Sequence, residues 1–198
     1  GAACPAILTK TEGLALTLPL QRKGRYRGVW TAFWFCLLGS AMIFLPFQIV
    51  DGGLFIYAGD FNSQQISFWQ YANDFVKQGG GQFSWATDLG SSFVNSYSFY
   101  LLGSPFFWFS LLFPSSWLPY LMCPLLCLKF AVAGAGAFLW LRRYSRGRNM
   151  AIIGACLYAF SGFTIYNVFF NHFVDVIALF PFLLWSLDEM VLEKRYGW

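Results

Sequence analysis

Charged side chains are scarce in this sequence. Only 11% of its 198 residues are charged, whereas 58% are hydrophobic and 22% are aromatic, and the mean hydropathy is +0.53. A soluble domain of this length buries one core and covers the rest of its surface with charge, so the composition excludes an ordinary water-soluble domain. The sequence therefore predicts a protein embedded in a lipid bilayer.

Metal-binding and nucleotide-binding signatures are also missing. The sequence has one histidine, and its five cysteines lie mostly within apolar runs, without CxxC spacing: Cys4, Cys36, Cys123, Cys127 and Cys156. This pattern indicates neither a zinc site nor a disulfide framework, and the expected role of these thiols is apolar packing. No P-loop, GxGxxG, HExxH or GxSxG motif is present, which counts against nucleotide-driven and familiar hydrolytic chemistry.

Basic residues are slightly in excess, with 13 Lys and Arg, 9 Asp and Glu, and a net charge of +4. They form short blocks beside apolar runs, so we interpret them as signals of membrane topology and expect no nucleic-acid partner. The chain opens at Gly1 with no evident cleavable signal and stops at Trp198 after a basic cluster. We therefore expect an N-terminal fragment of a longer protein.

Four apolar stretches have about the length that a membrane-crossing helix needs, roughly 20 residues. They are residues 29–50, 118–141, 150–170 and 176–192. The sequence thus predicts an all-α membrane protein, a multi-span helical bundle. Residues 1–28 are expected to form a cytoplasmic segment, and residues 29–198 the N-terminal part of the transmembrane domain.

Residues 51–117 separate the first two stretches, and we expect an outer loop there because they hold four aspartates with Lys77 as the only base. Within this loop, residues 97–113 are apolar but short. If they crossed the membrane, the four arginines after Leu141 would lie on the same side as the acidic loop, against the usual bias. We therefore expect a juxtamembrane or re-entrant element at 97–113.

Asp60 is the first candidate for chemistry. It follows the first stretch by about ten residues and precedes an amphipathic run, residues 66–75, whose apolar side chains recur at helical spacing. A helix of this kind lies on the membrane surface and would hold Asp60 where lipid meets water. A carboxylate at that depth is suited to take a proton from an attacking hydroxyl group. A solvated loop aspartate and a helix N-cap are the alternatives.

Lys129 falls near the middle of the second stretch, where a lone charge costs roughly 2.5 to 3.5 kcal/mol. It is expected to contact a phosphate or carboxylate, or else to form a structural ion pair or reach the interface. His172 and Asp175 lie in a predicted polar turn, residues 171–175, where the histidine could bind a phosphate or orient a carboxylate, although a lone loop histidine usually does neither. Asp88 precedes small residues, and a tight turn explains it.

Six short motifs, in this order, are similar to the YfhO family of bacterial membrane proteins, which has a GT-C type glycosyltransferase architecture. They run over about residues 29–192 and are Gly59-Asp60 with Gln64-Gln65, Asp88 to Phe93, Ser96 to Phe106, Leu128-Lys129 with Ala133-Gly134, Tyr158 to Gly162, and Asp175 ahead of an apolar span. Family members are much longer than this chain.

The resemblance implies transfer of a hexose or N-acetylhexosamine from a polyprenyl-phosphate carrier to an extracytoplasmic acceptor, such as lipoteichoic or wall teichoic acid or another cell-surface polymer. The reaction would invert the anomeric carbon at the bacterial plasma membrane. GT-C enzymes carry an acidic residue in the first outer loop, and Asp60 occupies that place as the expected base. Lys129 would neutralise the departing phosphate, while Gln64 and Gln65 would hold sugar hydroxyls or orient Asp60.

The resemblance also implies further contacts. Asp88, His172 and Asp175 are expected to bind substrate, and the rings of Trp69, Trp85 and Tyr97 to stack on sugar faces. We expect no cofactor and no divalent metal, because Asp60 and Asp88 form no DxD pair. The bilayer and the enzyme that makes the lipid-linked sugar are the other expected partners. A transporter or lipid flippase, which would contain paired broken helices in related halves, and a non-catalytic membrane scaffold are the alternatives.

Overall fold

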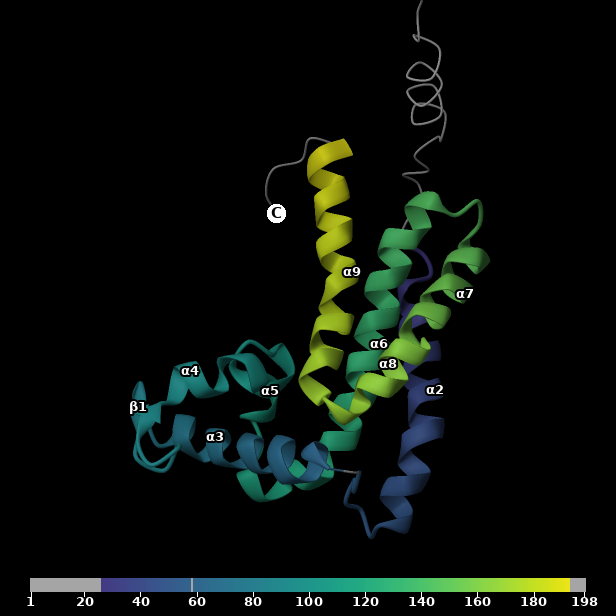
Figure 1. Ribbon diagram of the computed structural model, residues 1–198. Coiled ribbons are helices and arrows are strands. Elements are labelled where there is room, and N and C mark those ends of the chain that lie inside the picture. The colour runs from purple at the N-terminus through teal and green to yellow at the C-terminus, as the bar shows by residue number, and fades with distance from the viewer. Residues whose placement is uncertain (1–25, 58, 193–198) are drawn as a thin grey trace, which may run out of the picture.

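A computed structural model describes residues 26–57 and 59–192, and these residues are almost entirely helical. Four helices form one bundle: α2 (Val29–Val50), α6 (Leu118–Tyr144), α7 (Arg148–Ala159) and α9 (Asn171–Leu192) (Figure 1). The predicted all-α bundle is confirmed. We call the end of the bundle where α6 meets α7 the arginine-rich end, because Arg142, Arg143, Arg146 and Arg148 lie there.

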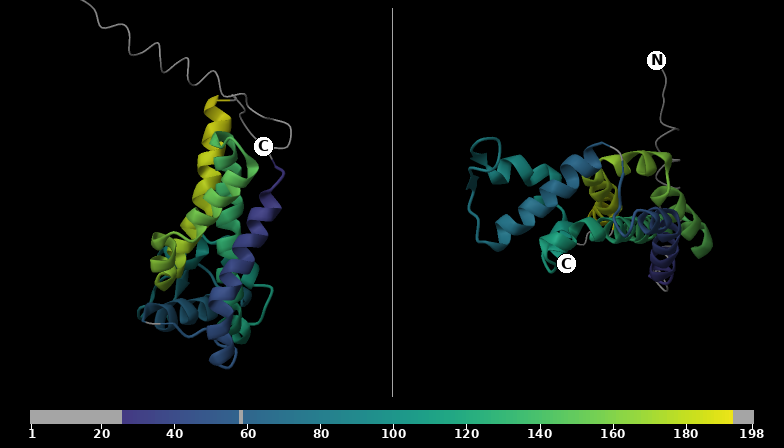
Figure 2. Two further views of the ribbon diagram at one scale, coloured as in Figure 1. Left: turned by 90° about the vertical axis from the view of Figure 1, so that its right-hand side faces the viewer. Right: turned by 90° about the horizontal axis from the view of Figure 1, so that it is seen from below.

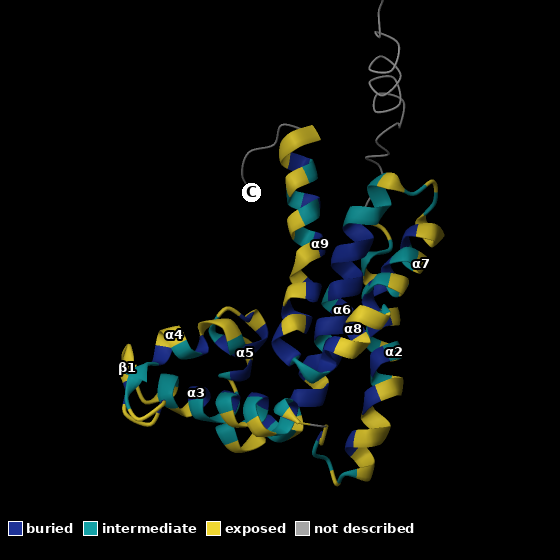
Figure 3. Cartoon of the chain, viewed as in Figure 1, coloured by how far each residue is buried: buried dark blue, intermediate teal, exposed yellow. Residues whose placement is uncertain are grey.

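Helix α6 is the centre of the bundle and packs against α2, α7 and α9. It is buried over most of its length, whereas the other three helices present exposed apolar faces (Figure 3). Small residues on α6 let its neighbours approach closely. A Cβ atom at Gly134 would lie only 2.3 Å from Cys36 Sγ of α2. Close contacts through small residues of this kind are typical of helices that pack within a membrane.

Two polar contacts join α6 to α9. Near the arginine-rich end, Arg143 pairs with Glu189 at 2.9 Å, and Asp188 accepts hydrogen bonds from Trp140 Nε1 at 3.1 Å and from the Tyr144 hydroxyl at 2.6 Å. The second contact involves Lys129, in the middle of α6, and is described with the candidate site. Since both contacts hold charged groups of the two helices against each other, they fix the register of α9 on α6.

Three segments of the described residues are long and apolar enough to cross a membrane: Val29–Val50, Ser115–Tyr144 and Arg148–Phe169. They correspond to the first three predicted stretches, with bounds that differ by a few residues for the second and third. Helix α9 has 22 residues but carries Asp175, Asp188 and Glu189, and it is not among these segments. Its crossing of the membrane therefore stays a prediction.

The third stretch is not the single helix that the sequence predicts over 150–170. Helix α7 ends at Ala159, and the chain continues as α8 (Gly162–Tyr166) and the 3-10 turn η4 (Asn167–Phe169). The interruption has a local cause, because Ser161 Oγ accepts a hydrogen bond from the backbone N–H of Thr164 at 3.2 Å and so starts a new helix.

Residues 51–117 hold a set of short elements that we call the arm, residues 61–117. It comprises the π-helix η1 (Phe61–Ile66), α3 (Ser67–Lys77), the antiparallel pair β1 (Phe83–Ser84) and β2 (Ser91–Ser92), α4 (Phe93–Tyr97), the π-helix η2 (Ser98–Leu102), α5 (Pro105–Ser110) and the 3-10 turn η3 (Ser115–Trp117). The arm extends sideways from the bundle at the end opposite the arginine-rich end (Figures 1 and 2).

Helix α3 agrees with the amphipathic run predicted over 66–75, since it buries Trp69 and Ala72 on one face and exposes Asp74 on another. Residues 97–113 form no single helix. The helical pieces there are too short to cross a membrane, and η2 lies beside the start of α9, where Phe99 contacts Phe173. The arm thus folds as a short lateral layer, an arrangement compatible with the membrane interface.

Candidate functional site

Lys129 is the centre of the largest polar cluster that the structure builds from the predicted residues. Its side chain is fully buried, and Nζ lies 2.7 Å from Asp175 Oδ1. Nζ also donates to the Asn171 backbone oxygen at 3.0 Å and to Asn171 Oδ1 at 2.9 Å. Asn171 thus accepts two hydrogen bonds from the ammonium group, and Asp175 supplies the opposite charge. The lysine therefore forms a buried ion pair, one of the roles that the sequence left open.

The arm closes over this lysine. The rings of Trp69, from α3, and Phe106, from α5, lie 5.5 and 5.6 Å from Nζ, within the range of cation–π attraction. The Lys129 ammonium group thus contacts Asn171 and Asp175 of α9 and two aromatic rings of the arm. Because a buried charge is costly unless it is compensated, this arrangement ties the arm to the bundle at one point.

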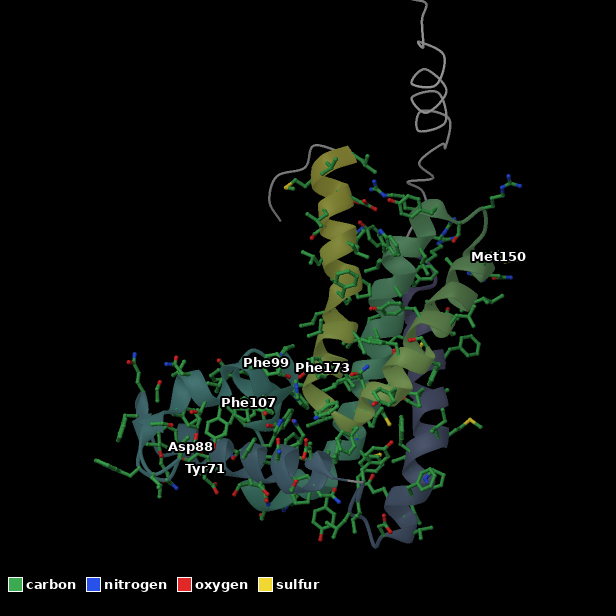
Figure 4. The ribbon with its side chains drawn as sticks, in the orientation of Figure 1. Tyr71, Asp88, Phe99, Phe107, Met150 and Phe173 are labelled. Carbon is green, nitrogen blue, oxygen red and sulfur yellow. The ribbon has the colours of Figure 1, made fainter. Side chains whose placement is uncertain are left out.

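Gln65 and His172 form a second contact between the arm and α9. Gln65 Nε2 lies 2.9 Å from His172 Nδ1. The amide nitrogen can only donate, so Nδ1 accepts and the neutral ring carries its proton on Nε2. Phe99 and Tyr100 of η2 pack against the imidazole, with ring centroids 4.7 and 5.0 Å away (Figure 4 shows Phe99 beside Phe173 at this junction).

The predicted polar turn over 171–175 is wrong, because α9 begins at Asn171. Asn171 and Asp175 are four residues apart and so share one face of that helix. This face points at Lys129, which bonds both residues. Asn171 was not predicted as a partner of Lys129. In a turn, residues 171 and 175 need not lie on the same side, whereas in a helix their four-residue spacing places them together.

Asp60 lies at the start of the arm, immediately before η1, and is partly exposed. Gln64 Nε2 donates to Asp60 Oδ1 at 3.2 Å. The Asp60 side chain makes no capping hydrogen bond to the helix it precedes, so the helix N-cap alternative does not apply. It also forms no ion pair with any residue in 26–57 or 59–192. One carboxylate oxygen is therefore oriented by Gln64, and no cation of the described residues pairs with the group.

Gly59 sets the position of Asp60. Its backbone has φ +55°, and a Cβ atom there would lie 2.6 Å from Phe169 Cζ, at the end of the broken third segment. Only glycine combines this left-handed conformation with so close an approach. The two glutamines that follow point to different places. Gln64 holds Asp60, whereas Gln65 is buried against His172.

Replacing Gly59 by Ala is expected to destabilise the protein more than replacing Gly52 by Ala. Both positions have positive φ, at +55° and +68°, but no atom lies within 4 Å of a Cβ at Gly52. Each variant should lose about 1 kcal/mol to backbone strain, and Gly59→Ala should lose a further 1 to 3 kcal/mol or so to overpacking. Unfolding in detergent measures the difference, and equal losses would contradict the packing argument.

Asp88 is not brought to these clusters. It is exposed at the far tip of the arm, near Tyr71 and away from the bundle (Figure 4). Asp88 and Leu89 have φ values of +47° and +63°, which fit the tight turn that the sequence suggested. Beneath this turn the Tyr71 hydroxyl bonds Ser84 Oγ and, at 3.2 Å, Thr87 Oγ1.

The aromatic residues proposed as sugar platforms are mostly inaccessible. Trp69 is 1% exposed and Tyr97 is 8% exposed, so neither presents a ring face, and that prediction is wrong for both. Burial also raises the pKa of the Tyr97 phenol, which keeps it a neutral group of the arm core. Trp85, at 79%, is open to a ligand.

A comparison with protein families decides the membership of this chain. Residues 32–198 match the model of a family described as bacterial membrane protein YfhO. The chain belongs to the YfhO family. Searches of the curated proteins and of the solved structures find no significant match. YfhO membership fits a membrane glycosyltransferase in general terms.

Proposed function

We propose that this YfhO protein is a membrane glycosyltransferase of the GT-C type, with Asp60 as the general base. It moves a hexosyl or N-acetylhexosaminyl group from a polyprenyl phosphate to an extracytoplasmic acceptor such as a teichoic acid or another surface polymer. The observation that carries the proposal is the state of Asp60. This carboxylate is partly exposed, is held by Gln64, and is neither used as a cap nor paired with a described cation.

Chemistry and position agree in this proposal. A lipid-linked donor presents its anomeric carbon at the membrane surface, so a base at the junction of the arm and the bundle is within reach. Asp60 takes the proton of the acceptor hydroxyl while that oxygen attacks the anomeric carbon. The C–O bond to the polyprenyl phosphate breaks on the opposite face, and the configuration inverts. No metal enters this mechanism, and Asp60 and Asp88 lie at opposite ends of α3.

The remaining predicted residues receive two kinds of role. Gln64 orients Asp60 and is close enough to it to contact the acceptor. Lys129 and Asp175 form a buried ion pair, and together with Gln65 and His172 they position the arm on the bundle. A phosphate could reach Lys129 only by displacing Asp175. We therefore assign these four residues to positioning rather than to direct contact with the leaving group.

Asp60→Asn in the intact protein, followed by measurement of sugar incorporation into surface polymers, tests the proposal. Incorporation at the unmodified rate, with normal protein levels, excludes Asp60 as the base.

One observation favours the transporter or flippase alternative. The segment α7–α8–η4 is a broken helix, and broken helices line the binding sites of many transporters. That alternative requires paired breaks in related halves. Among the described residues, α2, α6 and α9 each contain a proline, at Pro46, Pro124 and Pro181, yet each runs on as one helix. The single break therefore supports the alternative only weakly, and lipid scrambling in proteoliposomes that survives Asp60→Asn would favour it.

A further inference from the structure

An open apolar pocket lies between α2 and α7, on the opposite side of α6 from the arm. Its volume is about 430 Å³, and its lining consists of Phe35, Ile152, Ile153, Cys156, Leu157 and Phe160. None of these side chains carries a charge or an amide. Within the bilayer, an open hollow of this chemistry accepts a hydrocarbon chain, because neither water nor a polar group is stabilised there.

The pocket runs lengthwise from the arginine-rich end. Arg148, Ile152 and Cys156 follow one another at four-residue spacing along one side of α7, and Phe160 comes directly after the last residue of that helix. A rise of about 1.5 Å per residue places the pocket from roughly 6 to 18 Å below Arg148. The Arg148 side chain also reaches α2, since a Cβ at Gly28 would lie 3.1 Å from Arg148 Cδ. We call the contact between α2 and α7 the seam. The pocket lies along this seam, and Arg148 lies at its arginine-rich end.

Three arginines at this end of the contact between α2 and α7 have no partner among the residues that the structure describes. Arg27, Arg146 and Arg148 are exposed, and none forms an ion pair or a side-chain hydrogen bond within residues 26–57 and 59–192. Asp188 and Glu189, the two acids of the described part of α9 that lie at this end, are bonded to α6. The N-terminal ends of α2 and α7 meet here as well, and neither Gly28 nor Gly147 supplies a side-chain cap.

From this arrangement we infer that the seam between α2 and α7 binds an anionic phospholipid. One acyl chain occupies the apolar pocket, and the phosphate lies on Arg148 with Arg27 and Arg146 beside it. Charge complementarity selects this occupant, because a neutral headgroup or the apolar flank of another helix would leave three arginines without a counter-charge. Basic groups next to a membrane attract anionic lipids by about 1 kcal/mol each. The inference does not depend on the proposed transfer reaction.

Lipid counting by native mass spectrometry tests the inference on the intact protein in mild detergent. The protein is titrated separately with phosphatidylglycerol and with phosphatidylcholine of the same acyl chains. We expect one phosphatidylglycerol to be retained with an affinity at least about fivefold higher than that of phosphatidylcholine. Arg148→Gln should weaken the phosphatidylglycerol site about fivefold, the effect of one basic group. Ile153→Trp, which fills the pocket, should weaken retention of either lipid.

Two matched variants serve as controls. Lys77→Gln removes one exposed positive charge from the arm, and Leu183→Trp enlarges an exposed apolar side chain on α9. Neither should change lipid retention, and all four variants should unfold near the temperature of the unmodified protein. Equal retention of the two lipids, or equal effects of Arg148→Gln and Lys77→Gln, would overturn the inference. It would also be overturned if the unmodified protein dimerised without bound lipid and Ile153→Trp broke that dimer.

Discussion

Asp60→Asn should lower sugar incorporation by about 10²- to 10⁴-fold, the usual contribution of a positioned general base. The amide has nearly the shape of the carboxylate and can still bond Gln64, so the arm keeps its structure. It has no basicity, however, and the attacking hydroxyl must lose its proton to water. The rate of incorporation into surface polymers, measured at matched protein levels with saturating lipid-linked donor, reports this loss.

Asp74→Asn is the matched control for this experiment. Asp74 is also a carboxylate of the arm, exposed on α3 and without a described ion pair. Its replacement should leave incorporation within about twofold, because a surface charge remote from the reacting atoms changes little. If both variants kept full activity, the base would have to be another residue. If both lost activity alike, the arm would need its net charge rather than one particular base.

Asp175→Asn should lower the free energy of unfolding by about 3 to 5 kcal/mol, the cost of leaving one partner of a buried ion pair uncompensated. Lys129 is 0% exposed, so its ammonium group is not in contact with water. The two oxygens of Asn171 remain, but a neutral amide cannot replace the carboxylate 2.7 Å away. Reversible unfolding in detergent, followed by tryptophan fluorescence, measures the change.

The double variant Lys129→Met with Asp175→Leu separates the pair from its surroundings. Replacing both charges by apolar groups of similar volume is often neutral or stabilising, so the double variant should recover most of the loss. A double variant as unstable as Asp175→Asn would mean that packing, and not charge, explains the effect. A change below about 1 kcal/mol in Asp175→Asn alone would contradict the buried ion pair itself.

Much of the helical framework follows from apolar length alone. Helix α2 covers residues 29–50 as predicted, and α6 starts at Leu118 as predicted but continues to Tyr144. The predicted helix boundaries are wrong where local hydrogen bonds of polar side chains compete with the apolar pattern. Ser161 caps the new helix α8 by accepting a hydrogen bond from the backbone N–H of Thr164. The hydropathy of the sequence does not predict such a bond. The start of α9 was lost because Asn171 and Asp175 look like turn residues until Lys129 is placed beside them.

The candidate site could be predicted in parts but not as one assembly. The spacing of Asp60 and Gln64, four residues apart, indicates contact on one helical turn, and the structure shows that bond. Gln65 contacts His172, which lies 107 residues further along the chain, and Lys129 contacts Asp175, which lies 46 residues further. No local sequence pattern predicts contacts over such separations. These long-range pairs define how the arm sits on the bundle. They also show Lys129 paired with Asp175, where the sequence had left a phosphate contact and an ion pair open.

The account depends most on which side of the membrane the arm faces. A cysteine-free protein, with Ala in place of the five cysteines, provides the background for two single changes. Ser67→Cys lies on the exposed side of α3, and Arg146→Cys is exposed between α6 and α7. A membrane-impermeant maleimide added to intact cells should label Ser67→Cys, whereas Arg146→Cys should react only after the cells are opened. Labelling of Arg146→Cys in intact cells, with Ser67→Cys protected until lysis, would place Asp60 in the cytosol and contradict the proposed transfer reaction.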